Sequence, residues 1–402
     1  MKRITIIGMG LGIDSITAEA WKAVEQADVL LGAPRLLELC EDLAKPSYPY
    51  YLPGDVKSLI AQHDAQEFAV LVSGDVGFYS AAAGLIDTLT EYDLCSIPGI
   101  STVNAFFAKL KLPWQDAEFV SLHGRNMNIV DTVRRSRLTF CLTGNNAREI
   151  GSALCQAGLG HIKTHVGENL GTMNERVYEM IASDLIQGNF RALTVLLFIN
   201  DEYDDSVPAG LPDSSFIRLT GIPMTKSEMR ALVLSKLNVH PGDICWDIGA
   251  GTGSVTVELA LCAYRGSVYA VERREDAVSL IGQNCQTFHI GNVTTVCGQA
   301  PAVLDALPAP DAVFIGGSGG ELPEIIAAVL RKNLNARMVV TAVTIETVTS
   351  ALSAFAKVGL EPEIVQINIA RAKKAGSLHM MEAQNPITVF SAGGRSSPGD
   401  RL

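Results

Sequence analysis

Short apolar runs alternate with helix-like segments along nearly the whole chain, and most of these runs end at a glycine. Runs of this kind are typical of buried strands, and the segments between them have the length of helices. In the first half this alternation predicts a mainly parallel sheet covered by helices. Its strands are expected at 3–8, 69–75, 118–124, 138–144 and 191–199, with helical patterns over 81–92 and 100–112.

The second half repeats the alternation more regularly and predicts a sheet of seven strands. The last two strands are joined by a stretch without a clear helical pattern, which allows an antiparallel hairpin at the edge of the sheet. The predicted fold class is therefore α/β in both halves. The seven strands are expected at 243–249, 266–272, 293–298, 311–317, 337–343, 363–369 and 386–392.

The two halves are separated by "NDEYDDSVPAGLPDSS" (200–215), which is acidic, holds two prolines and lacks an apolar period. Such a stretch is typical of a linker. The 402 residues of the chain also suit two domains of about 150–200 residues better than one. We predict domains at 1–200 and 216–394, a linker at 201–215 and a mobile tail at 395–402; a single domain with a long loop is the less favoured alternative.

Composition narrows the function classes. The formal net charge of -11 argues against nucleic-acid binding, and an anionic substrate would have to be attracted by local cations. Eight cysteines without C-x-x-C spacing predict reduced thiols, and neither they nor the seven histidines form a metal-ligand pattern. No run approaches the roughly 18 apolar residues of a membrane span. The N-terminus imitates a signal peptide, but its glycines and Asp14 favour a first strand, so a soluble, cytoplasmic protein is expected.

The segment "DICWDIGAGTGSVTVELA" (243–260) carries the clearest chemical signal. A strand ends in Asp247, and Gly249, Gly251 and Gly253 follow at alternate positions. Bare backbone lets a ligand lie against the loop, toward which the next helix points its N–H groups. The following strand ends in Glu272, whose carboxylate suits ribose hydroxyls. A glycine turn with a chance glutamate is the simpler reading, but glycine loop, strand order and acidic strand end together favour a nucleoside ligand.

This G-x-G-x-G spacing differs from the dinucleotide fingerprint G-x-G-x-x-G, so NAD is the weaker candidate. It resembles motif I of the S-adenosylmethionine-dependent methyltransferases with a Rossmann-like fold, and the resemblance implies that "CGQAP" (297–301) contacts adenine. The cofactor-binding residues expected in this half are Thr225, Asp247, Gly249, Ala250, Gly251, Thr252, Gly253, Glu272, Gln299 and Ala300.

The segment "PMTKSEMRALVLSKL" (223–237) precedes this strand and predicts a helix. Thr225 and Glu228 have the spacing of a capping box. Lys226 and Arg230 are candidates to hold substrate carboxylates beside the glycine loop, which is compatible with the cap. The apolar stripe of the helix would consist of Met229, Leu232, Val233 and Leu237.

Three segments of the first half, "IIGMGLG" (6–12), "SGDVGFYS" (73–80) and "PGISTVNAFFAKLKLPWQDAEFVSLHGR" (98–125), resemble the tetrapyrrole methylases. The resemblance implies a domain of two α/β subdomains that binds S-adenosylmethionine. Val76 and Leu11 stand where that family usually has proline, and Thr102 where it often has serine. The residues implied to bind cofactor are Gly8, Gly10, Gly12, Asp75, Ser101 and Thr102.

Five further residues are substrate candidates. His123 and Arg125 form a potential anion-binding or proton-handling pair, although a lone histidine at a strand end is more often structural. Arg371, Lys373 and His379 lie in the basic stretch "RAKKAGSLHMM" (371–381), for which a solvated loop is an equally good interpretation.

A tetrapyrrole methylase followed by a Rossmann-like methyltransferase resembles the fused, decarboxylating methyltransferases of cobalamin biosynthesis. The resemblance implies one S-adenosylmethionine per domain, a polycarboxylated tetrapyrrole substrate and a homo-oligomer. It also implies methylation at ring positions 5 and 15 and loss of carbon dioxide from the ring-C acetate. The same reaction on a cobalt-containing substrate and a different double methyltransferase remain open. So does a non-catalytic sensor with one degenerate half, which Val76 and Leu11 would favour.

Overall fold

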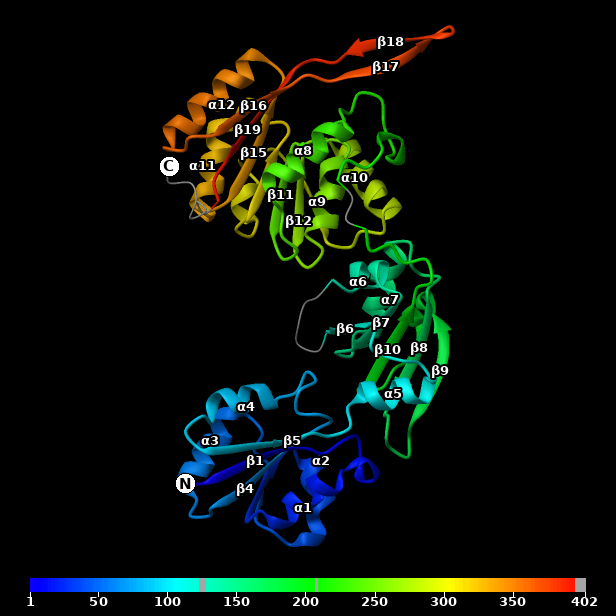
Figure 1. The fold of residues 1–402 in the computed structure, drawn as a ribbon, viewed down its shortest axis with the longest axis vertical. Helices are drawn as coiled ribbons and strands as arrows, with labels where there is room; N and C mark the ends of the chain where they lie inside the picture. Colours follow the sequence, from blue (N-terminus) through cyan, green and yellow to red (C-terminus); the bar gives the residue numbers. More distant parts are fainter. Residues whose placement is uncertain (123–127, 207–208, 395–402) are drawn as a thin grey trace. The chain divides into compact units, whose positions relative to one another are not determined.

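The computed structural model describes residues 1–122, 128–206 and 209–394 (Figure 1). Within them the chain divides into two compact units. The first holds the residues up to 122 together with 137–148 and 163–199, and the second holds 128–136, 149–162 and the residues from 200 onward. No helix among the described residues is both long and apolar enough to cross a membrane.

The first unit begins with a five-stranded sheet in the order β3-β2-β4-β1-β5, and all of its strand pairs are parallel. Side chains alternate across it: Ile4 and Ile6 pack with α3 and α4, while Ile7 packs with α1. The strands are β1 (Arg3–Gly8), β2 (Val29–Gly32), β3 (Ser47–Tyr48), β4 (Glu67–Val72) and β5 (Asp93–Ile97). The helices are η1 (Ile13–Ser15), α1 (Ala18–Gln26), α2 (Pro34–Leu37), η2 (Glu38–Leu43), α3 (Pro53–Gln62) and α4 (Ala82–Thr88).

A second five-stranded sheet, in the order β6-β7-β10-β8-β9, completes the first unit. Only β6 and β7 are parallel, so the predicted mainly parallel arrangement is wrong for this sheet. Short connections such as the one between β8 and β9 produce antiparallel neighbours, because a parallel crossover needs a dozen or more residues. The elements are α5 (Thr102–Leu110), β6 (Ala117–Ser121), β7 (Leu138–Leu142), β8 (Lys163–Glu168), β9 (Arg176–Ile181), η3 (Ala182–Gln187) and β10 (Thr194–Ile199).

The second unit contains a seven-stranded sheet in the order β13-β12-β11-β14-β15-β19-β16. The first five strands are parallel, and β19 is antiparallel to both β15 and β16. The antiparallel edge predicted from the sequence is thus confirmed. The strands are β11 (Ile244–Ile248), β12 (Ser267–Glu272), β13 (Val293–Cys297), β14 (Ala312–Ile315), β15 (Arg337–Ala342), β16 (Glu363–Ile367) and β19 (Ile387–Ala392).

Helices cover both faces of this sheet. Apolar side chains of α8, α9 and α10 form one core with the strands, and those of α11 and α12 form the other. Helices α6 and α7, although they precede residue 200, cluster with this unit. The helices are α6 (Ile129–Arg135), α7 (Ala147–Gln156), η4 (Asp213–Ser215), α8 (Ser227–Leu237), α9 (Ser254–Cys262), α10 (Glu275–Thr287), η5 (Leu304–Ala306), α11 (Leu322–Lys332) and α12 (Ile345–Lys357).

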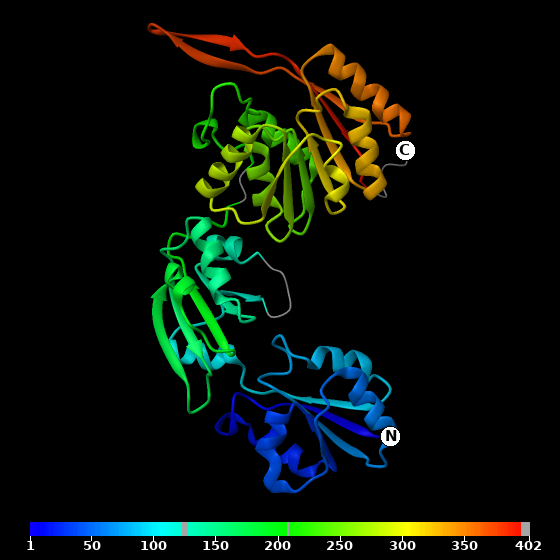
Figure 2. The same ribbon diagram turned by 180° about the vertical axis from the view of Figure 1, so that it is seen from behind.

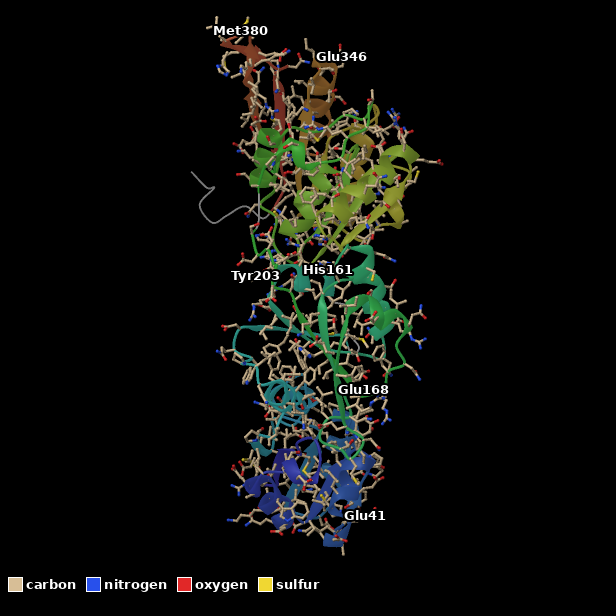
Figure 3. The ribbon with its side chains drawn as sticks, turned by 90° about the vertical axis from the view of Figure 1, so that its right-hand side faces the viewer. Glu41, His161, Glu168, Tyr203, Glu346 and Met380 are labelled. Atoms are coloured by element: carbon tan, nitrogen blue, oxygen red, sulfur yellow. The ribbon has the colours of Figure 1, made fainter. Side chains whose placement is uncertain are left out.

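The stretch between β16 and β19 is a two-stranded ribbon of β17 (Ala370–Ala375) and β18 (Leu378–Ala383) that extends away from the seven-stranded sheet (Figure 2). Met380, labelled in Figure 3, is 64% exposed on it. The alternative of a solvated loop is thus right about exposure, since these side chains are almost all exposed, but wrong about structure: the segment pairs with itself across Gly376, which has a φ of +64°.

The eight cysteines are all free thiols. Cys40, Cys141, Cys245 and Cys285 are buried, and burial raises the pKa of the Cys141 thiol to about 12. Cys95 of the first unit and Cys297 of the second are exposed.

Candidate active sites

The second unit has a cavity of about 390 Å³ beside the carboxyl ends of β11, β12 and β14. Ligands of open α/β sheets bind at this edge of the strands. Seven residues predicted to bind cofactor line the cavity, namely Thr225, Gly249, Ala250, Gly251, Glu272, Gln299 and Ala300. The structure thus brings together residues that lie up to 75 positions apart (Thr225 to Ala300).

Two glycine loops meet at this cavity. Gly249 has a φ of +74°, and a Cβ added to it would lie 2.6 Å from the carbonyl oxygen of Gly317. Only bare backbone allows that approach. Gly317 belongs to the loop after β14, which lines the cavity through Gly316, Gly317 and Gly319 but is absent from the predicted site. Its signal was available in the sequence, because "IGGSGG" (315–320) also follows an apolar strand.

Glu272 presents its carboxylate to the cavity from the end of β12. One oxygen, Oε2, accepts a hydrogen bond from the amide of Gly251 at 3.0 Å, and Oε1 accepts one from the amide of Arg274 at 3.0 Å. Only 9% of the residue is exposed. These bonds fix the carboxylate against the glycine loop and leave further lone pairs on both oxygens for other donors.

Asp247, Thr252 and Gly253 lie behind the loop and are not among the residues that line the cavity. Asp247 is fully buried, and its Oδ2 accepts a hydrogen bond from Thr256 Oγ1 at 2.5 Å. Burial raises the pKa of this carboxyl group to about 7, against the opposing effect of that bond. Within the described parts of the chain, neither Asp247 Oδ1 nor the Thr252 hydroxyl has a hydrogen-bond partner.

The first unit has a cavity of about 490 Å³. The predicted residues Asp75, Ser101 and Thr102 line it, at the ends of β4 and β5. Asp75 is oriented by the amides of Gly77, at 2.8 Å, and Gly99, at 3.3 Å. Residues of the second sheet and its loops complete the wall, including Thr143, Thr172 and Ala192 to Val195 at the start of β10.

Gly8, Gly10 and Gly12 do not line this cavity, but two of them join the loops that do. A Cβ on Gly8 would lie 2.6 Å from the amide nitrogen of Gly99. Gly10 and Gly74 exchange two backbone hydrogen bonds, at 3.2 and 2.9 Å. The opening glycine loop therefore acts by close packing against the two cavity loops. His123 and Arg125 lie outside the described residues.

Three of the cations predicted to bind substrate converge instead on Asp213. Arg230 Nη1 lies 3.0 Å, Arg371 Nη1 3.1 Å and Lys226 Nζ 4.0 Å from its carboxylate oxygens. Burial alone would raise the pKa of Asp213, but the hydrogen bonds from the two arginines hold it below its ordinary value. None of the predicted substrate-binding cations that the structure describes lines the cavity of the second unit.

Arg230 has no exposed surface, and its guanidinium donates to Glu258 at 2.6 Å, to Asp213 and to the carbonyl oxygens of Thr225 and Leu211. The prediction that Arg230 holds a substrate carboxylate is therefore wrong: the side chain is fully buried and each of its three guanidinium nitrogens donates within the protein, so we assign it a structural role. The predicted capping box is also wrong, because α8 begins at Ser227 with Lys226 as its N-cap. Glu228 binds Arg371 instead.

The other candidates of the basic stretch belong to the ribbon. Lys373 Nζ lies 3.4 Å from Glu382 Oε1 on the opposite strand, and both side chains are largely exposed. His379 is the cross-strand partner of Lys374. The exposed pair of Lys373 and Glu382 contributes modestly to the pairing of β17 with β18.

Each half of the chain is similar to a known family of methyltransferases. Residues 3–186 match the tetrapyrrole (corrin/porphyrin) methylases, and residues 220–393 match the precorrin methyltransferase domain. The second half is 42% identical over 185 residues to a probable cobalt-precorrin-6B C(15)-methyltransferase (decarboxylating) of Pyrobaculum calidifontis, covering 46% of this chain and 95% of that protein. A crystal structure of a precorrin-6Y C5,15-methyltransferase from Geobacter metallireducens matches at 39% identity with a TM-score of 0.43, covering 46% of this chain and 96% of that one.

A relative matches nearly the full length. The precorrin-6Y C(5,15)-methyltransferase [decarboxylating] of Sinorhizobium sp is 31% identical over 398 residues, which cover 96% of this chain and 95% of that protein. One chain of that family therefore has both halves in this order. With a match of this extent, the chain belongs to the precorrin-6Y C(5,15)-methyltransferases (decarboxylating).

Proposed function

We propose that the protein methylates precorrin-6B at positions 5 and 15 and removes the carboxyl group of the ring-C acetate, giving precorrin-8X in cobalamin biosynthesis. The observation that carries this proposal is that each unit has a cavity lined by loops at the carboxyl ends of its parallel strands, where the predicted cofactor-binding residues lie. Two separate cofactor sites suit two methylations of one macrocycle. The full-length relationship to a C(5,15)-methyltransferase supports the same conclusion.

S-adenosylmethionine, when bound, supplies a methyl group on a positively charged sulfur. In the second unit, the loop at 249–253 and the loop at 316–319 would hold it against bare backbone, and Glu272 would accept bonds from its ribose. In the first unit, Asp75, Ser101 and Thr102 would hold the cofactor. The chain's part in each transfer is to align the reacting carbon with the methyl group and to keep water out.

We assign methylation at position 15 and the decarboxylation to the second unit, and methylation at position 5 to the first. The Pyrobaculum calidifontis protein, which corresponds to the second half alone, is named as a decarboxylating C(15)-methyltransferase. Decarboxylation needs an electron sink, which the conjugated pyrrole–imine system of the substrate supplies.

We further propose the domain limits 1–200 and 216–394, with a Rossmann-like seven-stranded methyltransferase fold for the second domain. The observed sheet order and the match of residues 220–393 support these limits. A cytoplasmic dimer or tetramer completes the proposal, and light scattering of the purified protein would test its assembly.

The decisive experiment uses the purified chain, metal-free precorrin-6B and methyl-labelled S-adenosylmethionine, with the product weighed by mass spectrometry. Two labelled methyl groups and one lost carbon dioxide are expected. One methyl group with decarboxylation would reveal a silent first unit, and no transfer would contradict the metal-free substrate. Gly251→Arg should abolish one of two cofactor sites in equilibrium dialysis, whereas a chain with one degenerate half would lose all binding.

The same reaction on the cobalt-containing intermediate is the second candidate. It is favoured by the 42% identity of the second half to a probable cobalt-precorrin-6B enzyme. Parallel assays with the metal-free and the cobalt-containing substrate, compared by kcat/KM, distinguish the two.

A further inference from the structure

A smaller cavity borders the cavity of the first unit. It measures about 190 Å³, and we call it the side cavity. Its apolar lining comes from the ends of β2 and β4 and from α2 and α4, through Ala33, Leu36, Val70, Leu71, Val72 and Leu85. Five residues line both cavities, so the two are adjoining compartments; they are Arg35, Ser73, Tyr79, Ser80 and Ala81.

Arg35 is the single Lys, Arg or His among the described residues that line either cavity. It follows β2 by three residues and is exposed. The described part of the chain offers it no ion-pair partner within 4 Å, unlike Arg3, Arg134, Arg230 and Arg371, which all have one. A guanidinium at the junction of two cavities in a chain of net charge -11 is suited to a carboxylate ligand.

Two aromatic residues line the same cavities as Arg35. Tyr79 lines both cavities and has a φ of +46°, which is costly for an aromatic residue and occurs mainly where the surroundings enforce it. Its hydroxyl donates to the carbonyl oxygen of Phe119 at 2.9 Å, which ties it to β6. Tyr51, which is 49% exposed, lines the side cavity. Faces of this kind bind flat conjugated rings.

We infer that Arg35 binds a carboxylate side chain of the tetrapyrrole at the first active site, while Tyr51 and Tyr79 pack against the ring. The inference rests on the proposed function and adds a substrate anchor to it. The flat ring would contact the aromatic faces, and the guanidinium would fix its orientation through one peripheral carboxylate. A carboxylate is also present on the methionine portion of the cofactor, so the test has to separate these two sources.

The test uses the full-length protein and the variants Arg35→Ala and Arg35→Lys. Arg3→Ala is the matched control, because it also removes one positive charge from an exposed side chain. Arg3 lies at the amino end of β1, whereas the cavity loops lie beyond its carboxyl end at Gly8. The readouts are labelled methyl groups and carbon dioxide lost per precorrin-6B, KM and kcat for each methylation, and the dissociation constant of S-adenosylmethionine by equilibrium dialysis.

For Arg35→Ala we expect kcat/KM of the position-5 methylation to fall about 10- to 100-fold, the range for a lost hydrogen bond to a charged group. Methylation at position 15, decarboxylation and cofactor affinity should stay at wild-type values. Arg35→Lys should recover part of the loss, because it keeps the charge without the planar fork. Arg3→Ala should match the wild type in every readout.

Three outcomes would overturn the inference. Wild-type methylation at position 5 in Arg35→Ala would show that Arg35 does not bind substrate. Weaker cofactor binding in that variant would assign Arg35 to the methionine carboxylate. Loss of both methylations, with Arg3→Ala unaffected, would contradict a role confined to the first unit. If the wild type itself transfers no methyl group, the proposed function fails first, which separates the two failures.

Discussion

Gly249 and Gly282 show how differently two glycines of the second unit depend on lacking a side chain. Gly249 has a positive φ, and a Cβ added to it would clash with the carbonyl oxygen of Gly317. A Cβ added to Gly282 in α10 would meet open space. Gly249→Ala should lower the free energy of unfolding by at least about 1–2 kcal/mol, the cost of a left-handed conformation, before the clash is counted. Gly282→Ala should raise it by roughly 0.5–1 kcal/mol.

Urea titration of both variants checks this expectation, and dialysis shows whether Gly249→Ala also loses cofactor. Equal effects of the two substitutions would contradict the geometry of the loop.

Asp247 makes stability depend on pH. Its pKa lies at about 7 in the folded protein against an ordinary 3.8, so between these values the folded state keeps a proton that the unfolded chain has released. The stability that the protonated Asp247 carboxyl gives the folded state is fully present at acidic pH and is lost as the pH rises from about 4 toward 7. Relative to Asp247→Asn, which cannot ionise, the wild type should lose stability from about pH 4 to pH 7 and then level off. Unfolding titrations across this range measure it; a constant difference would contradict the burial effect.

At the residue scale the sequence predicted the cofactor loops better than the substrate contacts. Glycines and acids after strands, such as Gly249 and Glu272, are fixed by local patterns, and the structure places both at the cavity. The structural role of Arg230 could not be predicted from a local pattern, because its partner Glu258 is 28 residues away on α9. Arg35 was missed for the same reason, because a lone cation after a strand carries no spacing signal.

Helices α8 and α9 hold the end of the predicted linker through a buried ion pair. Glu258 accepts bonds from Arg230 and from the amides of Gly210, at 2.7 Å, and Leu211, at 2.9 Å. Glu258→Gln would leave the buried Arg230 with Asp213 as its carboxylate partner, which Arg371 also binds, so the substitution should destabilise the second unit by up to about 3–5 kcal/mol. Thermal and urea unfolding measure this loss.

A surface pair serves as the control for that prediction. Arg331 and Asp305 lie 3.1 Å apart with side chains that are 60% and 75% exposed. Asp305→Asn should change stability by no more than about 1 kcal/mol. A similar loss in both variants would mean that burial of Arg230 and Glu258 is not what makes their pairing important.

The β17–β18 ribbon is anchored at its base by Arg371, which donates to Glu228 and Asp213. A two-stranded ribbon alone is marginally stable in water, so this anchor restricts its opening. Arg371→Ala should speed trypsin cleavage after Lys373 and Lys374 several-fold without a change in the thermal unfolding of the sheet. Lys373→Ala and Lys374→Ala identify the cleaved bonds, and unchanged proteolysis would contradict an anchoring role.

Element positions followed largely from the sequence. The predicted strands at 3–8 and 293–298 correspond to β1 and β13 within one residue, because apolar runs ending at glycine mark buried strands. Strand direction did not follow in the second sheet of the first unit, where β8, β9 and β10 pair antiparallel. Their order depends on long-range pairing that no local pattern encodes. The ribbon was hidden because its side chains are exposed on both faces and lack an apolar period.

The whole molecule consists of two units with a cavity in each, which predicts separable activities. A fragment of residues 209–394 should fold and transfer one methyl group to precorrin-6B with loss of carbon dioxide, as its similarity to a shorter C(15)-methyltransferase implies. Circular dichroism and mass spectrometry check folding and product. A folded fragment that gives no transfer would contradict the assignment; a fragment that adds two methyl groups would leave no task for the first unit.

The distribution of thiols offers a further use. One exposed cysteine lies in each unit, Cys95 on β5 and Cys297 at the end of β13, while four others are buried and Cys155 and Cys262 are half-buried. Maleimide dyes attached to these two positions would form a donor–acceptor pair that spans the units without engineered cysteines. Since Cys297 precedes Gly298, which lines the second cavity, its dye would also report ligand arrival. Energy transfer in single molecules would then compare the distance between the two dyes with and without substrate.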